Sequence, residues 1–106
     1  MSYDPNNVFA RILRGEIPCK KVHEDAHTLA FHDINPQAKV HVLVIPKKAY
    51  VSMDDFSANA SEAEIAALFR AVGLVARQVG VADSGYRILA NSGRHSHQEV
   101  PHLHIH

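Results

Sequence analysis

The last five residues of the chain alternate between histidine and an aliphatic side chain: His102-Leu103-His104-Ile105-His106. Successive side chains of a β-strand point to opposite faces, so the alternation predicts a strand with three imidazoles on one face. Leu103 and Ile105 can then bury against a helix, which leaves the imidazoles about 6 to 7 Å apart along the other face. The pattern therefore predicts a rigid platform for a site built from histidines.

Histidine is unusually frequent, with nine in the chain and five of them in the last twelve residues. An imidazole can act as a nucleophile, a general acid, a general base or a metal ligand. Three in a row allow one to attack while its neighbours hold charge and protons. Two alternatives stay open on residue types alone. The histidines can form the solvated face of a surface strand, or two of them can share a zinc ion with a third ligand from elsewhere.

Length and charge restrict the class of protein. With 106 residues, we expect a single domain over residues 1–106. Lys plus Arg and Asp plus Glu are 11 each, which argues against a broad nucleic-acid surface but allows a pocket for one nucleotide. No apolar run approaches the roughly 20 residues that span a bilayer, and the first residues lack the features of a secretory signal. The single cysteine, Cys19, permits no internal disulfide. We expect a cytoplasmic protein without a nucleic-acid or membrane partner.

The predicted order of elements is helix, three strands, helix and two strands. Asn6 or Asn7 can cap the first helix, and Ser61 with Glu64 forms a capping box for the second. Short turns between neighbouring strands favour antiparallel pairing. We expect an α+β fold with a five-stranded antiparallel sheet and both helices packed against it. The predicted helices cover residues 8–14 and 61–79, and the strands cover 21–24, 28–33, 40–45, 86–90 and 100–106.

The chain resembles the histidine triad (HIT) family, in which histidines alternate with hydrophobic residues. QEVP before HLHIH resembles the family's active-site hairpin, together with ILANSG. VFARILRGEIP is similar to the N-terminal helix, and LAFHDINPQAKVHVLVIPKK to the central strands. The most similar branch contains the histidine triad nucleotide-binding proteins, which hydrolyse purine nucleoside phosphoramidates. The resemblance implies a HIT-like fold, a purine nucleotide or nucleoside phosphoramidate as the bound molecule, and no cofactor.

The resemblance also implies a double displacement. His104 would attack the α-phosphorus and form a nucleotidyl-histidine, from which water releases the nucleoside monophosphate. His106 would contact the phosphate and help the leaving group to accept a proton. His102 would position the site, with His41 from a neighbouring strand behind it.

The nucleotide-binding positions follow from the same resemblance. Asp33 aligns with the residue that accepts hydrogen bonds from the ribose hydroxyls. Without the resemblance, it would be interpreted as an acid in a surface turn, and the apolar positions as ordinary core. The implied base pocket consists of Phe9, Ile12, Ile17, Phe31 and Ile34, and the residues near the phosphate and leaving group are Asn91, Gln98, Glu99 and Val100.

Some family members carry a structural zinc on two cysteines and two histidines. Asn7 and Ala10 occupy the cysteine positions here, and Ala49 occupies one of the histidine positions. Only His102 remains of the four, so we expect no structural metal.

Two further departures concern the site itself. Glu99 stands where a serine is common in the eukaryotic branch, and its carboxylate should repel a phosphate unless it points away or binds an amine leaving group. The family pattern continues beyond the histidines, so we expect a shortened C-terminal segment that ends at His106. The resemblance implies a homodimer, which would also cover an exposed sheet edge. A nucleotide-binding module with little turnover and a metal-binding protein stay as alternatives.

Overall fold

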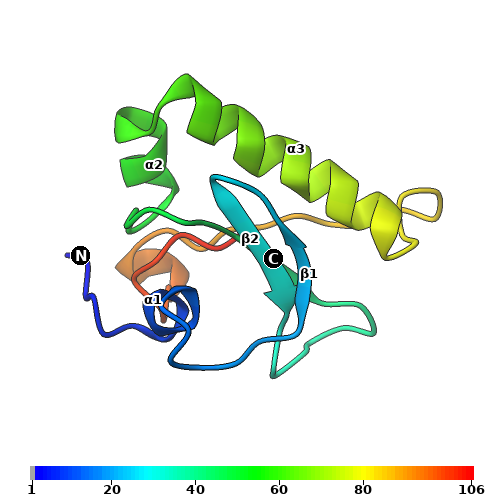
Figure 1. Cartoon of the computed structure of the whole chain (residues 1–106), viewed down its shortest axis with the longest axis horizontal. Coiled ribbons are helices and arrows are strands. Elements are labelled where there is room, and N and C mark those ends of the chain that lie inside the picture. The colour runs from blue at the N-terminus through cyan, green and yellow to red at the C-terminus, as the bar shows by residue number, and fades with distance from the viewer. Residues whose placement is uncertain (1) are drawn as a thin grey trace.

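The computed structural model describes residues 2–106 and has a three-stranded antiparallel sheet in the order β1-β2-β3. The elements are α1 (Val8–Leu13), β1 (Lys21–Glu24), β2 (Thr28–His32), β3 (Val42–Pro46), α2 (Met53–Asn59), α3 (Glu62–Gln78) and the short 3-10 helix η1 (Arg94–Ser96). Helix α3 crosses one face of the sheet, and α1 lies on the opposite side (Figure 1). The predicted α+β class is confirmed. Within the described residues, no helix has the length and apolar character needed to cross a membrane.

Side-chain alternation along the strands divides the core into two layers. Phe9 of α1 packs with the residues of β2 and β3 that face it. The residues between them, Ala30 and Val44, face α3 and pack with its buried stripe. The layer on the α1 side contains Phe9, Leu29, Phe31, Leu43 and Ile45, and the layer on the α3 side contains Ala30, Val44, Leu68, Ala71, Val72 and Val75.

Helix α3 starts and ends where its local signals predict. The Ser61 hydroxyl accepts a hydrogen bond from the backbone N–H of Glu64 at 3.1 Å, and the Glu64 carboxylate accepts one from the backbone N–H of Ser61 at 3.0 Å. This capping box satisfies two N–H groups that the first turn leaves free. Gly80 follows with a φ of +82°, a left-handed conformation that favours glycine and ends the helix.

The prediction of five regular strands is wrong for residues 2–106, where the sheet has three. In place of ladders, residues 86–90 contribute one hydrogen-bonded pair and residues 100–106 contribute two. Ile105 exchanges two bonds of 2.9 Å with Val44, and His106 exchanges bonds of 2.7 and 3.1 Å with Leu89. Pro101 has no N–H to donate, and the backbone bond from His102 to Val100 turns the chain there, so the ladder stops.

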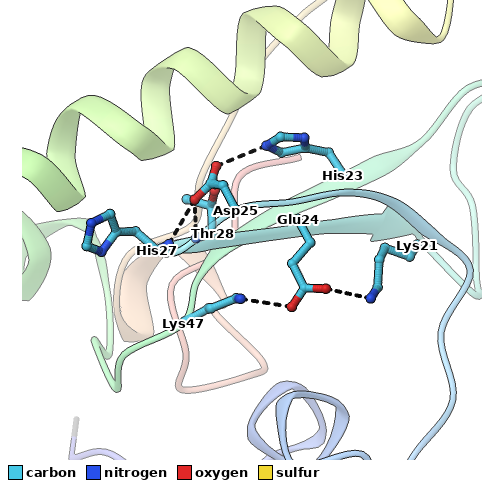
Figure 2. Close-up of polar contacts among 7 residues, drawn as sticks. All are labelled: Lys21, His23, Glu24, Asp25, His27, Thr28 and Lys47. Carbon is cyan, nitrogen blue, oxygen red and sulfur yellow. Dashed lines mark hydrogen bonds and ion pairs between the residues drawn. The ribbon is translucent and has the colours of Figure 1, made fainter.

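A hydrogen-bonded carboxylate organises the turn between β1 and β2 (Figure 2). Asp25 accepts bonds from the backbone N–H groups of His27 at 2.8 Å and Thr28 at 2.9 Å, from the buried Thr28 hydroxyl, and from His23 Nε2 at 2.9 Å. Burial by itself would raise the pKa of Asp25, but these bonds outweigh it and hold the pKa at about 2. Beside it, Glu24 pairs with Lys21 and Lys47 at the surface.

Replacing Asp25 by Ala should lower the free energy of unfolding by roughly 2 kcal/mol at neutral pH, because a buried hydroxyl and two turn N–H groups lose their acceptor. The pKa of Asp25 is lower in the folded chain than its ordinary 3.8. Its stabilisation is therefore complete above that value and lost as the pH falls through about 2. Urea unfolding from pH 7 to pH 2 should show the two proteins converging in acid.

Glu24→Gln is the matched control, since it removes a neighbouring carboxylate whose partners lie at the surface. Its effect should be small and should shrink further in high salt. Equal losses in the two variants would contradict the assignment of the turn to Asp25.

Candidate active site

The histidine segment separates its side chains as the alternation predicts. Leu103 and Ile105 are buried in the layer that faces α3. The imidazoles lie on the α1 side, where the Phe9 ring centroid is 4.9 Å from that of His104. The rings of His104 and His106 are also 4.9 Å apart. The predicted common face is confirmed, although two bonded pairs, with Val44 and with Leu89, hold the segment in place of a continuous strand.

The protonation of His104 follows from its one hydrogen bond. Nδ1 lies 2.8 Å from the backbone carbonyl oxygen of His102, which can only accept, so Nδ1 donates and the lone pair is on Nε2. That nitrogen has no hydrogen-bond partner among residues 2–106. Burial lowers the pKa of His104 below 6.5, against the raising effects of the His102 carbonyl and the carboxylates of Asp33 and Glu99. The result at neutral pH is a neutral imidazole with an uncommitted lone pair, suited to nucleophilic attack, proton abstraction or ligation.

His41 and His106 form a second directed pair. The backbone N–H of Gln37 donates to His41 Nδ1 at 2.9 Å, so the proton of a neutral His41 is on Nε2. This nitrogen lies 2.8 Å from His106 Nδ1 and donates to it, which leaves the proton of a neutral His106 on Nε2. His106 Nε2 is buried, and nothing in residues 2–106 bonds to it. The site therefore contains one imidazole with a free acceptor nitrogen and a neighbour with a free donor N–H.

His102 lies behind this pair, and both of its ring nitrogens are occupied. Nε2 donates to the backbone carbonyl of Pro46 at 2.8 Å, and the Tyr3 hydroxyl donates to Nδ1 at 2.7 Å. The residue is fully buried, and burial lowers the pKa of its imidazole, with the Pro46 carbonyl opposing and the charge of His104 adding to the effect. The sequence analysis did not identify Tyr3, Gln37 or Pro46. Gln37 and Pro46 act through backbone atoms, and no sequence motif marks Tyr3.

Asp33 is half-buried beside His41. One carboxylate oxygen accepts from the backbone N–H of Asn35 at 2.9 Å, and the other lies 3.4 Å from His41 Nε2. Asp33, His41 and His106 offer ligand atoms within 4.8 Å of one another, so these three residues could hold a metal ion. A hydrogen bond already joins His41 Nε2 to His106 Nδ1. The expectation of no structural metal stays a prediction.

The structure brings most of the apolar candidates together and separates two of them. Phe9 and Phe31 are buried in the α1 layer, and Ile12 and Val100 pack against its edge. The side of the site next to His104 is therefore apolar. Two candidates, Ile17 and Ile34, lie outside this cluster: Ile17 is half-buried, and Ile34 is 98% exposed in the bend after β2.

The polar candidates of the last loop have different environments. Asn91 lines a groove of about 660 Å³ that also touches His41 and His106. Gln98 is buried, and its amide donates to the carbonyls of Val51 and Val100 at 2.7 and 2.9 Å and accepts from the N–H of Gly93 at 2.8 Å. That side chain is committed to shaping the loop. Glu99 is exposed, and its carboxylate has no hydrogen-bond or ion-pair partner among the residues described.

Comparisons with known proteins find matches over most of the chain. The model of the HIT domain matches residues 14–106. An uncharacterised 13.2 kDa HIT-like protein of Azospirillum brasilense is 76% identical over 105 residues, which cover 99% of this chain and 86% of that protein. The purine nucleoside phosphoramidase of Escherichia coli K12 is 39% identical over 99 residues, covering 93% of this chain and 82% of the enzyme.

Solved structures are similar over the same length. The crystal structure of a HIT family hydrolase from Legionella pneumophila Philadelphia 1 superposes with a TM-score of 0.86 at 38% identity, covering 94% of this chain and 88% of that one. A histidine triad nucleotide-binding protein from Candida albicans gives a TM-score of 0.85 at 31% identity, covering 94% and 71%.

The imidazole of His104 should titrate below 6.5, because burial disfavours its charged form. A ¹⁵N NMR titration should show that the His104 ring is still mostly neutral, in its Nδ1–H tautomer, when the pH has fallen to 6.5. An unstructured histidine peptide, measured in parallel, should be half protonated there. Titration of His104 at or above 6.5, or a proton on Nε2 of the neutral ring, would contradict the arrangement described.

Proposed function

We propose that this chain, which belongs to the histidine triad (HIT) family, hydrolyses purine nucleoside 5'-phosphoramidates, or related nucleotide P–N and P–O bonds, through a nucleotidyl-histidine intermediate. The observation that carries the proposal is the state of His104, whose Nδ1–H is held by a carbonyl while Nε2 stays free. A second support is the relative at 39% identity, whose name is purine nucleoside phosphoramidase.

In the first step, the lone pair of His104 Nε2 attacks the α-phosphorus, and the bond from phosphorus to the leaving nitrogen breaks. The leaving nitrogen takes a proton from solvent, while His106 Nε2–H, the buried donor without a partner in residues 2–106, donates a hydrogen bond to a phosphate oxygen. In the second step, water attacks phosphorus, displaces His104 Nε2 and releases one proton to solvent. The products are an amine and a nucleoside monophosphate, and both imidazoles end in their starting states.

The proposed substrate contacts divide between the two sides of the site. Asp33 would accept from the ribose hydroxyls, since its Oδ2 has only a 3.4 Å contact with His41. The base would lie on the apolar side marked by Phe9. Glu99, exposed and without a partner among residues 2–106, would face an amine-bearing leaving group. The remaining proposed contact residues are Ile12, Ile17, Phe31, Ile34, Asn91, Gln98 and Val100, with Gln98 acting through the loop that it shapes.

Replacing His104 by Ala should reduce hydrolysis of an adenosine phosphoramidate by about a thousandfold or more, because the covalent route loses its nucleophile. Brief mixing of the unaltered protein with the substrate, followed by mass spectrometry, should find one adenylyl group on His104. His97→Ala is the matched control, since His97 is exposed in the neighbouring loop and should keep full turnover. Circular dichroism should show the same fold in all three proteins.

Other outcomes of this experiment separate the alternatives. Unchanged turnover in the His104 variant would remove it as the nucleophile. Tight binding of a purine monophosphate without any hydrolysis would favour a nucleotide-binding module. Loss of turnover on chelation, with stoichiometric bound metal, would favour a metal-dependent reaction at Asp33, His41 and His106.

We also propose that the chain forms a homodimer through the segment at residues 86–90. Among these residues, only Leu89 has backbone hydrogen bonds within the described chain, both of them to His106. The backbone groups on the opposite edge of the segment are therefore unpaired within the described chain. Two half-exposed apolar side chains, Tyr86 and Ile88, belong to the same segment. An unpaired, apolar edge is stabilised by pairing with a second copy.

Ile88→Lys should shift the protein from dimer to monomer in analytical ultracentrifugation, because a charge at the interface must lose its hydration on pairing. Val8→Lys is the control, since Val8 is similarly exposed but belongs to α1, which lies on the side of the sheet opposite α3 (Figure 1). A monomer before any substitution, or a dimer that survives Ile88→Lys, would exclude this interface.

A further inference from the structure

Tyr3 reaches across almost the whole sequence to the histidine site. Its hydroxyl lies 2.7 Å from His102 Nδ1, and the two ring centroids are 5.5 Å apart. The other nitrogen of His102 donates to the Pro46 carbonyl, so Nδ1 is the acceptor and the tyrosine hydroxyl is the donor. Because His102 has no exposed surface, a water molecule could replace the Tyr3 hydroxyl at Nδ1 only if the surrounding residues rearranged.

The segment that carries Tyr3 is itself fixed. Asn7 donates from its backbone and its side chain to the Asp4 carbonyl, at 3.1 and 2.7 Å. The Asn7 carbonyl oxygen of the side chain also caps α1 by accepting from the N–H of Ala10 at 2.9 Å. Arg14 donates to the carbonyl of Pro5 at 2.7 Å. These bonds tie the turn to the first helix, so Tyr3 stands on a supported element.

We infer that Tyr3 is a positioning residue for the nucleotidyl transfer, acting on His104 through the ring and backbone of His102. The hydroxyl selects the tautomer in which His102 Nε2 donates to Pro46, and so pins the His102 ring at both ends. The carbonyl of this same residue accepts from His104 Nδ1 and thereby holds the attacking nitrogen in its orientation. The inference rests on the proposed function for its effect on rate, and on the hydrogen bonds alone for its effect on tautomers.

Tyr3→Phe keeps the ring and removes the hydroxyl. We expect the rate of His104 adenylylation in a single turnover to fall by about three- to tenfold, the range that one lost neutral hydrogen bond produces. KM for the nucleotide should change less than twofold, because Tyr3 contacts neither phosphate nor ribose in the proposed complex. Tyr50→Phe is the matched control, since it also removes a hydrogen-bonded tyrosine hydroxyl, one that donates to Glu64 at 2.9 and 3.0 Å and not to a histidine.

A ¹⁵N NMR spectrum of the imidazoles supplies a readout that fold stability alone would not change. The unaltered protein should show a slowly exchanging Tyr3 hydroxyl proton and an unprotonated His102 Nδ1 that accepts a hydrogen bond. In Tyr3→Phe, the His102 Nδ1 resonance should move, and His104 should become a mixture of its two tautomers.

The adenylylation measurements and the NMR spectra test the proposed function and the positioning role of Tyr3 separately. Absence of any adenylylated histidine in the unaltered protein would overturn the proposed function, while the spectra would still test Tyr3. Unchanged adenylylation and unchanged His104 tautomers in Tyr3→Phe would overturn the positioning role. A loss of rate that Tyr50→Phe reproduces would overturn it as well.

Discussion

The antiparallel pairing of Ile105 with Val44 is the interaction on which the site depends. Its two backbone bonds of 2.9 Å fix which way every side chain of the last segment points. A slip of one residue would turn the imidazoles into the apolar layer under α3 and expose Leu103 and Ile105. Buried imidazole nitrogens without partners would make that register costly. The hydrophobic layer therefore selects the face on which the chemistry can occur.

Elements with local signals were predictable from the sequence. The capping box at Ser61 and the glycine after Val79 define α3, and the β-branched run defines β3. Helix α2 was missed although Ser52 caps it by accepting from the N–H of Asp55, because it has seven residues and buries only Phe56. The last two predicted strands depend on tertiary partners, so alternation in sequence could indicate their facing directions but not the length of their ladders.

The candidate site was predictable in its residue types and less so in its hydrogen bonds. The alternating histidines indicate a shared face, and the family resemblance supplies roles for Asp33 and His41. Neither could indicate that carbonyl groups of Pro46 and His102 select the tautomers of two imidazoles, because a backbone atom leaves no sequence signature. The resemblance can also mislead about a residue's environment. Ile34 aligns with a pocket position, but it is almost fully exposed in this structure.

Electrostatics explain why tautomers matter so much in this site. Burial lowers the pKa of all three histidines of the segment, while Asp33 and Glu99 partly oppose that effect at His104. Neutral imidazoles and nearby carboxylates provide little positive charge that could attract an anionic phosphate. Directed N–H groups must then supply the attraction, and among residues 2–106 His106 Nε2 is the buried side-chain N–H that has no partner. Under the proposed function, an amine-bearing leaving group would offset the remaining repulsion by its own positive charge opposite Glu99.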